Sequence, residues 1–442
     1  MTNDNHQCRF CASPNVSQII DFGSVGLAGA FLKPDQFAAE KKYDQQLYFC
    51  SDCYLLQIIN KVPPTVLFKD YFYFSSAIAT LRKHFRSYAK EVTEKFLIPK
   101  KSSVLEIGCN DGILLKPFVE LEVKTVIGVD PSSNVIETIK DPNIIAINDF
   151  FTRERALKIR EDYGPINMIC ANNVFAHIED MHDVTAGIKT LLADDGVFVF
   201  EVHYIGSLID EIQYDMIYHE HLFYYSLLAL QNFFKGFDLE VFDVKPVDIH
   251  AGSMRYYVRH KDESNDKSVS LNVINLQKRE REKGFDKLET FQSYADKVAQ
   301  TKTDLMALLA DLKQEQKSIV GYGASGRANT TIQYCGIDDR HIDYMIDDAP
   351  AKHGYYTPGS HLEIKPRSAL EENTPDYILI FAWSFFNEII EKNMAYLKQG
   401  VKFIVPLPEV KVFSWQDGQI VEENYSETDD ADAKIVSMSE HK

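Results

Sequence analysis

The chain has 442 residues, an apolar fraction of 45% and a formal net charge of −18 at pH 7. This length is enough for two or three cores, and we expect three domains. The negative charge argues against nucleic acid or an anionic membrane as the main partner, because binding to either needs a basic face. The sequence shows no apolar run near the roughly 18 residues of a membrane span and no signal-peptide pattern at Met1 to Gln7, so we expect a cytoplasmic protein.

Two cysteine pairs come early in the chain, Cys8 with Cys11 and Cys50 with Cys53. Thiolates at this spacing typically converge on one tetrahedral zinc ion, and four of them leave no open coordination position. We therefore predict a structural zinc site in a domain of residues 1–70. A redox pair is the alternative, but one pair would suffice for it, and no thioredoxin-like βαβ pattern surrounds either pair.

An aromatic cluster at residues 71–74 precedes an amphipathic pattern that predicts a helix over about 78–96. The cluster fits a core plug between domains. On the other face of an extended segment, Tyr71 and Tyr73 would instead line a ligand cleft.

Residues 104–115 predict a buried strand, a tight glycine turn and the start of a helix. Such a turn lets backbone amides approach a ligand at the carboxyl end of a parallel strand. The stretch lacks Gly-x-Gly-x-x-Gly and any basic residue for phosphate, and it offers carboxylate and amide oxygens instead. This favours the cationic, phosphate-free methionine end of S-adenosylmethionine over NAD. The candidate ligands are Glu106, Gly108, Asn110, Asp111 and Gly112.

The next predicted strand ends at Asp130, about 20 residues after the glycine turn, where such folds offer a carboxylate to ribose hydroxyls. Asp149 and Phe150 follow a third strand and would bracket the adenine. A fourth strand leads to Asn172, a further candidate cofactor ligand, and to His177. This histidine would either satisfy core or capping hydrogen bonds or contact the substrate, since it lies beside the ligand crevice of such sheets.

Further strands at residues 196–202, 239–244 and 254–258 continue the alternation of strands and helices. The order predicts an α/β fold with a doubly wound sheet and an antiparallel last strand, of the class I methyltransferase type, over residues 71–262.

The densest group of acid–base side chains is Tyr218-His219-Glu220-His221. It predicts proton-transfer chemistry, for which His221 is a competent base at neutral pH. If the segment is helical, Tyr218 and His221 share a face and His219 points elsewhere. A catalytic metal held by the two histidines is an alternative, although no third ligand is obvious nearby. A hydrogen-bonded lid without chemistry is another.

Residues 262–316 are highly charged with helical periodicity, which predicts a solvated helical connector. Residues 318–327 then place Gly-x-Gly-x-x-Gly between a strand and a helix, and Asp347 repeats the acid of the second strand. Taken alone this favours NAD, but the chain already has one complete cofactor site.

The connector and a Rossmann-like substrate domain should together span residues 263–421, with later strands at 378–383 and 402–406. Residues 422–442 are acidic and polar and are predicted to be disordered.

As a set, these motifs resemble the S-adenosylmethionine-dependent nucleotide-sugar C-methyltransferases, which act on keto-deoxysugars. The resemblance spans nearly the whole chain. It rests on the cysteine pairs, the Glu-x-Gly-Cys-Asn-Asp-Gly turn, the Tyr-His-Glu-His group with Tyr224-Tyr225-Ser226 after it, the His250–Arg255 segment and the late Gly-Tyr-Gly-Ala-Ser-Gly-Arg loop. It implies that a zinc domain and a Rossmann-like domain flank the methyltransferase domain, with a nucleotide sugar as substrate.

The resemblance also implies roles for single residues. His221 would remove the proton at the sugar carbon, with Tyr218 on the enolate oxygen and Glu220 orienting an imidazole or a sugar hydroxyl. His177 and Tyr73 would line the sugar site.

The amides of the late glycine loop would cradle the substrate pyrophosphate, unless this domain is a fold without a ligand. The candidate substrate ligands are Tyr71, His250, Ser253, Arg255, Gly321, Gly323, Ser325 and Arg327.

We therefore expect a C-methyltransferase that uses S-adenosylmethionine and a structural zinc ion, is a monomer or a homodimer, and acts on a dTDP- or GDP-linked keto-deoxysugar. Methylation of a non-sugar natural-product intermediate is one alternative. An NAD(P)-dependent oxidoreductase that uses the late glycine loop is the other.

Overall fold

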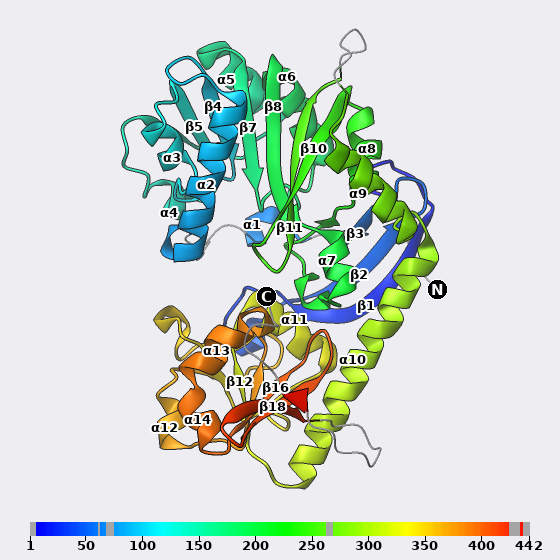
Figure 1. The fold of residues 1–442 in the computed structure, drawn as a ribbon, viewed down its shortest axis with the longest axis vertical. Coiled ribbons are helices and arrows are strands. Elements are labelled where there is room, and N and C mark those ends of the chain that lie inside the picture. The colour runs from blue at the N-terminus through cyan, green and yellow to red at the C-terminus, as the bar shows by residue number, and fades with distance from the viewer. Residues whose placement is uncertain (1–5, 61, 68–74, 262–267, 424–433, 436–442) are drawn as a thin grey trace. The chain divides into compact units, whose positions relative to one another are not determined.

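The computed structural model describes residues 6–60, 62–67, 75–261, 268–423 and 434–435. The chain forms two compact units, each made of stretches that are not consecutive in the sequence (Figure 1). The first unit contains Met1–Ser17, Tyr48–Gly206 and Glu220–Thr290, and the second contains Gln18–Leu47, Ser207–His219 and Phe291–Lys442. None of the described helices has the length and apolar character needed to cross a membrane.

The first unit is built on a seven-stranded sheet with the order β10-β11-β8-β7-β4-β5-β6. β11 runs antiparallel to both of its neighbours, while the strands from β8 to β6 are parallel. The predicted doubly wound sheet with an antiparallel strand is therefore confirmed. The strands are β4 Ser103–Ile107, β5 Thr125–Asp130, β6 Ile144–Asn148, β7 Ile166–Asn172, β8 Leu192–His203, β10 Leu239–Val247 and β11 Ser253–His260.

Helices cover both faces of this sheet (Figure 1). α2 and α3 pack on one face, and α5, α6, α8 and α9 pack on the other. Successive side chains of β8 point to opposite faces of the sheet. Val199 belongs to the core under α2, and Phe200 belongs to the core on the other face. The helices are α2 Ala79–Phe96, α3 Leu115–Glu120, α4 Ser133–Ile136, α5 Arg153–Tyr163, α6 Met181–Leu191, α8 Leu227–Lys235 and α9 Leu271–Glu282.

A four-stranded sheet has the order β1-β2-β3-β9; Cys50 ends its strand β2, and the other three cysteines of the two pairs lie outside its strands. Along the chain, β1 and β2 each pass from one unit into the other, while β3 pairs antiparallel with β9 inside the first unit. The elements are β1 Val16–Gly26, β2 Lys42–Cys50, β3 Leu56–Ile58 and β9 Phe223–Tyr224, with short helices η1 Pro34–Ala39, α1 Pro64–Leu67 and η2 Ser75–Ala77.

The second unit contains an eight-stranded sheet with the order β14-β13-β12-β15-β16-β17-β18-β19. The strands from β14 to β16 are parallel and the remaining ones are antiparallel, so the predicted C-terminal α/β domain is confirmed. Its strands are β12 Ile319–Tyr322, β13 Met345–Ile346, β14 Ile364–Lys365, β15 Tyr377–Ile380, β16 Lys402–Val405, β17 Lys411–Gln416, β18 Gln419–Glu423 and β19 Lys434–Ile435.

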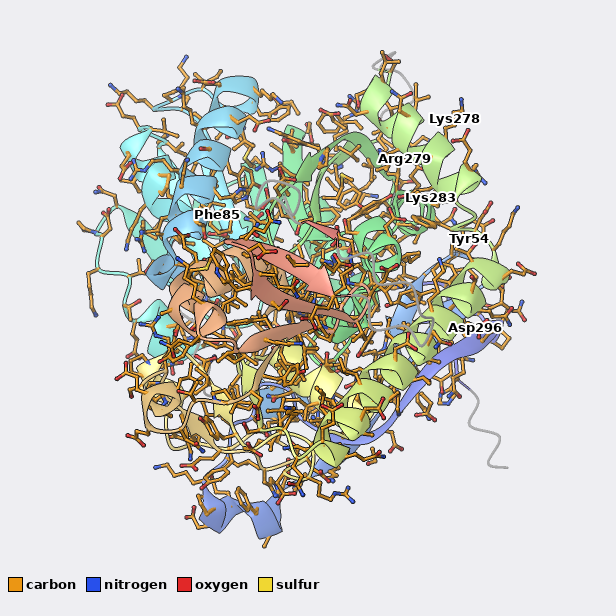
Figure 2. The ribbon with its side chains drawn as sticks, turned by 60° about the horizontal axis from the view of Figure 1, so that its bottom comes forward. Tyr54, Phe85, Lys278, Arg279, Lys283 and Asp296 are labelled. Atoms are coloured by element: carbon orange, nitrogen blue, oxygen red, sulfur yellow. The ribbon has the colours of Figure 1, made fainter. Side chains whose placement is uncertain are left out.

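Helices of the second unit surround this sheet and include the short η3, which directly precedes the Tyr-His-Glu-His group. The helices are η3 Tyr214–Met216, α11 Gly326–Cys335, η4 Pro350–Lys352, α12 Ala369–Glu372, η5 Trp383–Phe385, α13 Phe386–Lys392 and α14 Met394–Lys398. α7 Ile205–Asp210 and α10 Leu288–Gln314 cross the chain boundary between the units. α9 and α10 occupy the predicted helical connector, and Lys278 and Arg279 are exposed on α9 (Figure 2).

Two predicted boundaries differ from the structure. The strand expected over 378–383 ends at Ile380, and Trp383 begins η5. The tail expected to be disordered from residue 422 instead starts within β18, where Glu422 pairs with Lys411 at 3.2 Å and Glu423 pairs with Lys402 at 2.8 Å. These ion pairs extend the strand beyond its apolar residues. Residues 424–433 and 436–442 lie outside the described part of the chain.

Candidate functional site

The four cysteines of the two early pairs form a cluster whose sulfur atoms all lie within 4.8 Å of one another. Cys8 Sγ lies 3.5 Å from Cys53 Sγ, and Cys11 Sγ lies 3.6 Å from Cys50 Sγ. Zn–S bonds of about 2.3 Å in a tetrahedron separate sulfurs by about 3.8 Å, so these thiolates fit one zinc ion. Gln57 Nε2 donates to Cys8 Sγ at 3.1 Å, the kind of outer contact that orients a metal ligand.

The predicted glycine turn follows β4 in the first unit. Gly108 and Gly112 have φ angles of +67° and +77°, and Asn110 has a φ of 50°. A β-carbon on Gly108 would lie 2.7 Å from Val174 Cγ2. The turn therefore needs glycine at position 108, both for its backbone conformation and for space.

Three buried side-chain oxygens beside this turn have no hydrogen-bond partner among the described residues: Glu106 Oε2, Asp111 Oδ1 and Asn172 Oδ1. Asn172 Nδ2 donates to Glu106 Oε1 at 3.2 Å, and burial raises the pKa of Glu106 well above its ordinary value. Buried polar atoms are normally paired, so these oxygens call for a ligand with donors and positive charge. The ammonium and sulfonium of S-adenosylmethionine meet that requirement.

Asp130 ends β5, where the sequence predicts the ribose ligand. Its Oδ2 accepts from the amide of Asn110 at 2.9 Å, and its Oδ1 accepts from the amide of Ser132 at 2.9 Å. Each carboxylate oxygen can accept more than one hydrogen bond, so ribose hydroxyls can still donate to it.

The predicted adenine residues follow β6. The Phe150 side chain is 46% exposed, which leaves its ring accessible for stacking. Asp149 accepts from the amide of Phe150 at 2.8 Å and also pairs with the Arg155 guanidinium, which fixes its carboxylate beside that ring.

Tyr218-His219-Glu220-His221 forms a turn, neither a helix nor a strand. The helical spacing considered for Tyr218 and His221 therefore does not apply. Along the chain, His219 is the last residue of a stretch in the second unit, and Glu220 is the first of a stretch in the first. Burial lowers the pKa of His219, whose Nε2 lies 3.3 Å from the carbonyl oxygen of Asp44, so this imidazole packs inside the second unit.

His177 and His221 lie together in the first unit, with ring centroids 4.9 Å apart and planes at 79°. The amide of Leu222 donates to the carbonyl of Ala176 at 2.9 Å, which joins the two segments that carry the histidines. Burial, and then the neighbouring His221, lower the pKa of His177 well below its ordinary value. The His177 imidazole is therefore neutral at pH 7.

Glu220 directly precedes His221 and is partly buried. Burial raises the pKa of its carboxyl group to about 7. A carboxyl group with such a pKa exchanges its proton near neutral pH, as is common in acid–base sites.

The chain after His221 is held firmly. Tyr225 Oη donates to the carbonyl of Phe175 at 2.9 Å. The buried carboxylate of Glu280 accepts from the amides of Leu227 and Leu228 at 2.9 and 3.0 Å, at the start of α8. These bonds fix the chain on the carboxyl-terminal side of Glu220 and His221.

Predicted substrate residues outside this group have different surroundings. Tyr71 and Tyr73 lie outside the described residues. His250 has a φ of 50° in the turn between β10 and β11. Ser253 is buried and donates to the carbonyl of Ile249 at 3.1 Å, which closes that turn.

Arg255 is 2% exposed and fully engaged inside the first unit. Its Nε donates to Glu201 Oε1 at 2.6 Å and its Nη1 to Glu91 Oε2 at 3.1 Å, and its guanidinium lies 3.8 Å from the centroid of the Tyr88 ring. These contacts give Arg255 a structural role, and they do not support the predicted contact with substrate.

The late glycine loop links β12 to α11 in the second unit. Gly321 is in the strand, Gly323 has a φ of +92°, and Ser325 Oγ caps the helix by accepting from the amide of Ala328 at 3.2 Å. The loop thus has the strand–turn–helix form that the sequence predicts.

Lys352 bonds to this loop, a contact that the sequence does not reveal. Lys352 Nζ donates to the carbonyl of Ala324 at 2.7 Å and pairs with Asp347 Oδ2 at 3.0 Å. Asp347 is the acid that would bind the ribose of a dinucleotide, so an internal ion pair already engages it.

Arg327 is also engaged within the second unit. Its Nε and Nη2 donate to the two carboxylate oxygens of Asp215 at 2.8 and 3.2 Å, and the indole of Trp383 donates to Asp215 Oδ2 at 2.9 Å. A β-carbon on Gly326 would lie 3.7 Å from Tyr218 Cζ, so this glycine faces the phenol ring.

Sequence reasoning missed His84, Glu201 and Asp215 as members of buried charge clusters. His84 and Glu201 are bonded across 117 positions in the sequence, and Asp215 and Arg327 across 112. One signal was available, because Glu201 is a carboxylate inside the apolar run from Val197 to Val202.

Three family models match successive parts of the chain. Residues 8–68 match "Putative zinc binding domain", residues 81–244 match "Methyltransferase domain", and residues 248–408 match "C-methyltransferase C-terminal domain". The first covers the cysteine cluster, the second the glycine turn after β4, and the third the glycine loop after β12.

A curated relative matches almost the whole chain. C-methyltransferase NovU from Streptomyces niveus is 31% identical over 409 residues, which cover 92% of this chain and 97% of the relative. Among solved structures, an S-adenosylmethionine-dependent methyltransferase from Anabaena variabilis is 18% identical with a TM-score of 0.32, over 40% of this chain and 84% of that one. Magnesium protoporphyrin IX methyltransferase from Synechocystis is 11% identical with a TM-score of 0.31, over 40% and 82%. TM-scores this low carry no further conclusion.

Proposed function

Because the chain belongs to the S-adenosylmethionine-dependent C-methyltransferases, we propose that it methylates the carbon next to the ketone of a keto-deoxysugar linked to dTDP or GDP. One observation carries this proposal: the 4.9 Å pair of His177 and His221 belongs to the same unit as the glycine turn. A carbon acceptor must lose a proton before it can be methylated, and imidazoles are suited to take it. The sugar is supported by the set of motifs along the chain and by the second glycine loop.

The residues of the first unit would divide the proton chemistry among them. When bound, S-adenosylmethionine supplies an electrophilic methyl group. His221 takes the proton from the carbon beside the ketone. Neutral His177 lines the sugar site without competing for that proton, and Glu220, with a pKa of about 7, orients an imidazole or a sugar hydroxyl. Tyr218, which is in the second unit, and Tyr73, which lies outside the described residues, keep the roles expected from the sequence, on the enolate oxygen and in the sugar site.

The second glycine loop would receive the pyrophosphate of the nucleotide. The amides of Gly321 and Gly323 donate to the carbonyls of Tyr344 and Ile346 at 2.9 and 2.8 Å, so the proposed donors are the amides of residues 324–326 at the start of α11, where the helix dipole favours an anion. Arg327 would add positive charge while it stays on Asp215.

The alternative of an NAD-dependent oxidoreductase has less support. The relative that matches 92% of the chain is a C-methyltransferase, and Lys352, which pairs with Asp347 at 3.0 Å, would compete with a dinucleotide ribose for that carboxylate.

The test is mass spectrometry of the purified protein with S-adenosylmethionine and a panel of dTDP- and GDP-linked keto-deoxysugars, in parallel H₂O and D₂O reactions. The expected result is a gain of one methyl mass that fragmentation locates on carbon. Deuterium uptake beside the ketone without methylation would support the base and reject that particular sugar. Neither signal, with cofactor bound, would reject keto-deoxysugars and favour a non-sugar carbon acid.

A further inference from the structure

A row of polar side chains crosses four neighbouring strands of the first unit on the face that α2 covers. Glu106 lies on β4, Asn172 on β7, Glu201 on β8 and Arg255 on β11. Asn172 pairs with Glu201 in the strand register, and Arg255 also pairs with Glu201. Residues two positions earlier or later on these strands belong to the core beneath α2: Val104, Cys170, Val199 and Tyr257. The row therefore points to the same side as that core.

His84 reaches this row from α2. Its Nε2 lies 2.7 Å from Glu201 Oε2, and the Glu201 side chain is 0% exposed. The other carboxylate oxygen accepts from Arg255 at 2.6 Å. Burial alone would raise the pKa of Glu201, but His84 and Arg255 lower it overall, so Glu201 is a buried anion held between the His84 imidazole and the Arg255 guanidinium.

This arrangement orients the imidazole and leaves one of its nitrogens available. The bond to Glu201 is the one hydrogen bond that His84 makes with the described residues, and it uses Nε2. Nδ1 has no hydrogen-bond partner among the described residues. The His84 side chain is 16% exposed, so the ring is accessible to a ligand. A protonated histidine that donates one N–H to a carboxylate presents its other N–H as a directed donor.

The segment before His84 is tied to the glycine turn. The amide of Ser75 donates to Asn110 Oδ1 at 3.0 Å, and the amide of Ser76 donates to Asp111 Oδ2 at 3.1 Å. His84 follows early in α2, the helix that contains Phe85, labelled in Figure 2. Its partner Glu201 is the register neighbour of Asn172, which bonds to Glu106. The segment before the helix of His84 thus bonds to the glycine turn, and the partner of His84, Glu201, is one strand away from Asn172.

The charges at this end are unbalanced for the cofactor that it fits. The methionine part of S-adenosylmethionine has two positive groups and one carboxylate. Glu106, Asp111 and Asn172 offer oxygens that suit the positive groups, but the acids would repel the carboxylate. We propose that His84, oriented by Glu201, donates to the carboxylate of S-adenosylmethionine. This inference depends on the cofactor and not on the identity of the methyl acceptor.

The test compares two ligands that differ only in this carboxylate. The full-length, zinc-loaded protein is titrated calorimetrically with S-adenosylmethionine and with decarboxylated S-adenosylmethionine. In His84→Phe, which keeps an aromatic ring, affinity for S-adenosylmethionine should fall by about 10- to 100-fold, the usual effect of a hydrogen bond to a charged group. Affinity for the decarboxylated ligand should stay unchanged. Glu201→Gln should lower the ratio of the two affinities, S-adenosylmethionine to the decarboxylated ligand, by a smaller factor. This substitution loosens the His84 imidazole without removing it.

His182→Phe is the matched control, since His182 also packs against aromatic rings on a helix of the first unit. Its ratio of affinities should equal that of the wild type. If His84→Phe does not fold, His84→Asn gives the same comparison with a smaller side chain. An equal loss of affinity for both ligands, or an unchanged ratio with reduced turnover, would overturn the proposal. A wild type that binds S-adenosylmethionine no better than the decarboxylated ligand would overturn it as well.

Discussion

The two glycine turns of this chain share the strand–turn–helix form and differ in the state of their polar groups. Beside the turn after β4, three buried oxygens on Glu106, Asp111 and Asn172 have no partner among the described residues. Beside the loop after β12, Asp347 is bound by Lys352, and Arg327 is bound by Asp215. The first site thus has buried acceptors that a ligand could use, while the charged side chains of the second site are already paired with one another.

This difference separates what the pattern encodes from what it does not. A strand, a glycine with positive φ and a helix follow from local chemistry, and both turns have them. Ligand binding depends on which side chains other segments bring to the turn. η3 and η4 bring Asp215 and Lys352 to the second loop, whereas the first turn receives backbone amides from Ser75 and Ser76.

The largest expected effect is on kcat, and it distinguishes the proposed base from the second glycine loop. His221→Asn removes the proposed base at similar size and should lower kcat by about 10²- to 10⁴-fold, with cofactor affinity unchanged. Ser325→Ala in the second loop should instead raise KM for the nucleotide sugar and leave kcat alone. Steady-state rates of methyl transfer, followed by mass spectrometry, give both constants. Near wild-type turnover of His221→Asn would remove this residue from the chemistry.

Alanine at one glycine of each turn compares the two sites directly. A β-carbon would lie 2.7 Å from Val174 Cγ2 at Gly108 and 2.6 Å from Ala382 Cβ at Gly323. Left-handed strain and overpacking should each lower the free energy of unfolding, by about 2–4 kcal/mol in all. Both variants should therefore unfold at lower urea concentration. Only Gly108→Ala should lose binding of S-adenosylhomocysteine in calorimetry, and the same loss in Gly323→Ala would break the comparison.

The carboxylates of the two sites should respond differently to neutralisation. Glu106→Gln should weaken binding of S-adenosylmethionine by about 10- to 100-fold, since it removes a charged acceptor for the ammonium or sulfonium. Asp347→Asn, the matched change in the second unit, should leave that affinity unchanged. Calorimetric titration of both variants is the measurement, and an equal effect of the two would show that the acids are not distinct in role.

Glu106 also predicts a proton signature. Burial raises its pKa, so its contribution to the stability of the ligand-free protein is fully present below its unfolded pKa and is lost as pH rises through the raised folded value. A bound cation favours the carboxylate, so at a pH between these two values binding should release a proton from Glu106. Titration in two buffers of different ionisation enthalpy measures that release. Glu106→Gln should abolish it, and release that persists in the variant would assign the proton to another group.

The parts of the fold that depend on local chemistry were predictable. The cysteine pairs, the glycine turn, the helix over 78–96 and the strands of the central sheet follow from spacing and periodicity, and the structure has them. The turn at Tyr218–His221 was not predictable, because its shape is set by contacts of neighbouring residues with Asp44 and Ala176, far away in the sequence.

The ion pairs of two arginines were also not predictable, because their partners are far away in the sequence. Arg255 and Arg327 both look like free ligands for an anion in the sequence. Arg255 is instead bound at 2.6 Å to Glu201, which lies 54 positions away. Arg327 is bound at 2.8 Å to Asp215, which lies 112 positions away. Long-range ion pairs leave no periodic mark, so only the folded chain reveals them.

The smallest expected effect decides whether the second loop binds substrate at all. Arg327→Lys keeps the charge and loses the two-pronged contact with Asp215, which is worth about 1 kcal/mol and should raise KM for the nucleotide sugar about 5-fold. kcat and cofactor affinity should not change, because the turn after β4 lies in the other unit. Arg340→Lys is the control, since its pair with Asp338 is on the surface of the same unit. A lower melting temperature with unchanged KM would mean that Arg327 only fastens η3 to α11. The second glycine loop would then be an element of the fold without a ligand, and the polar groups that engage it would explain why.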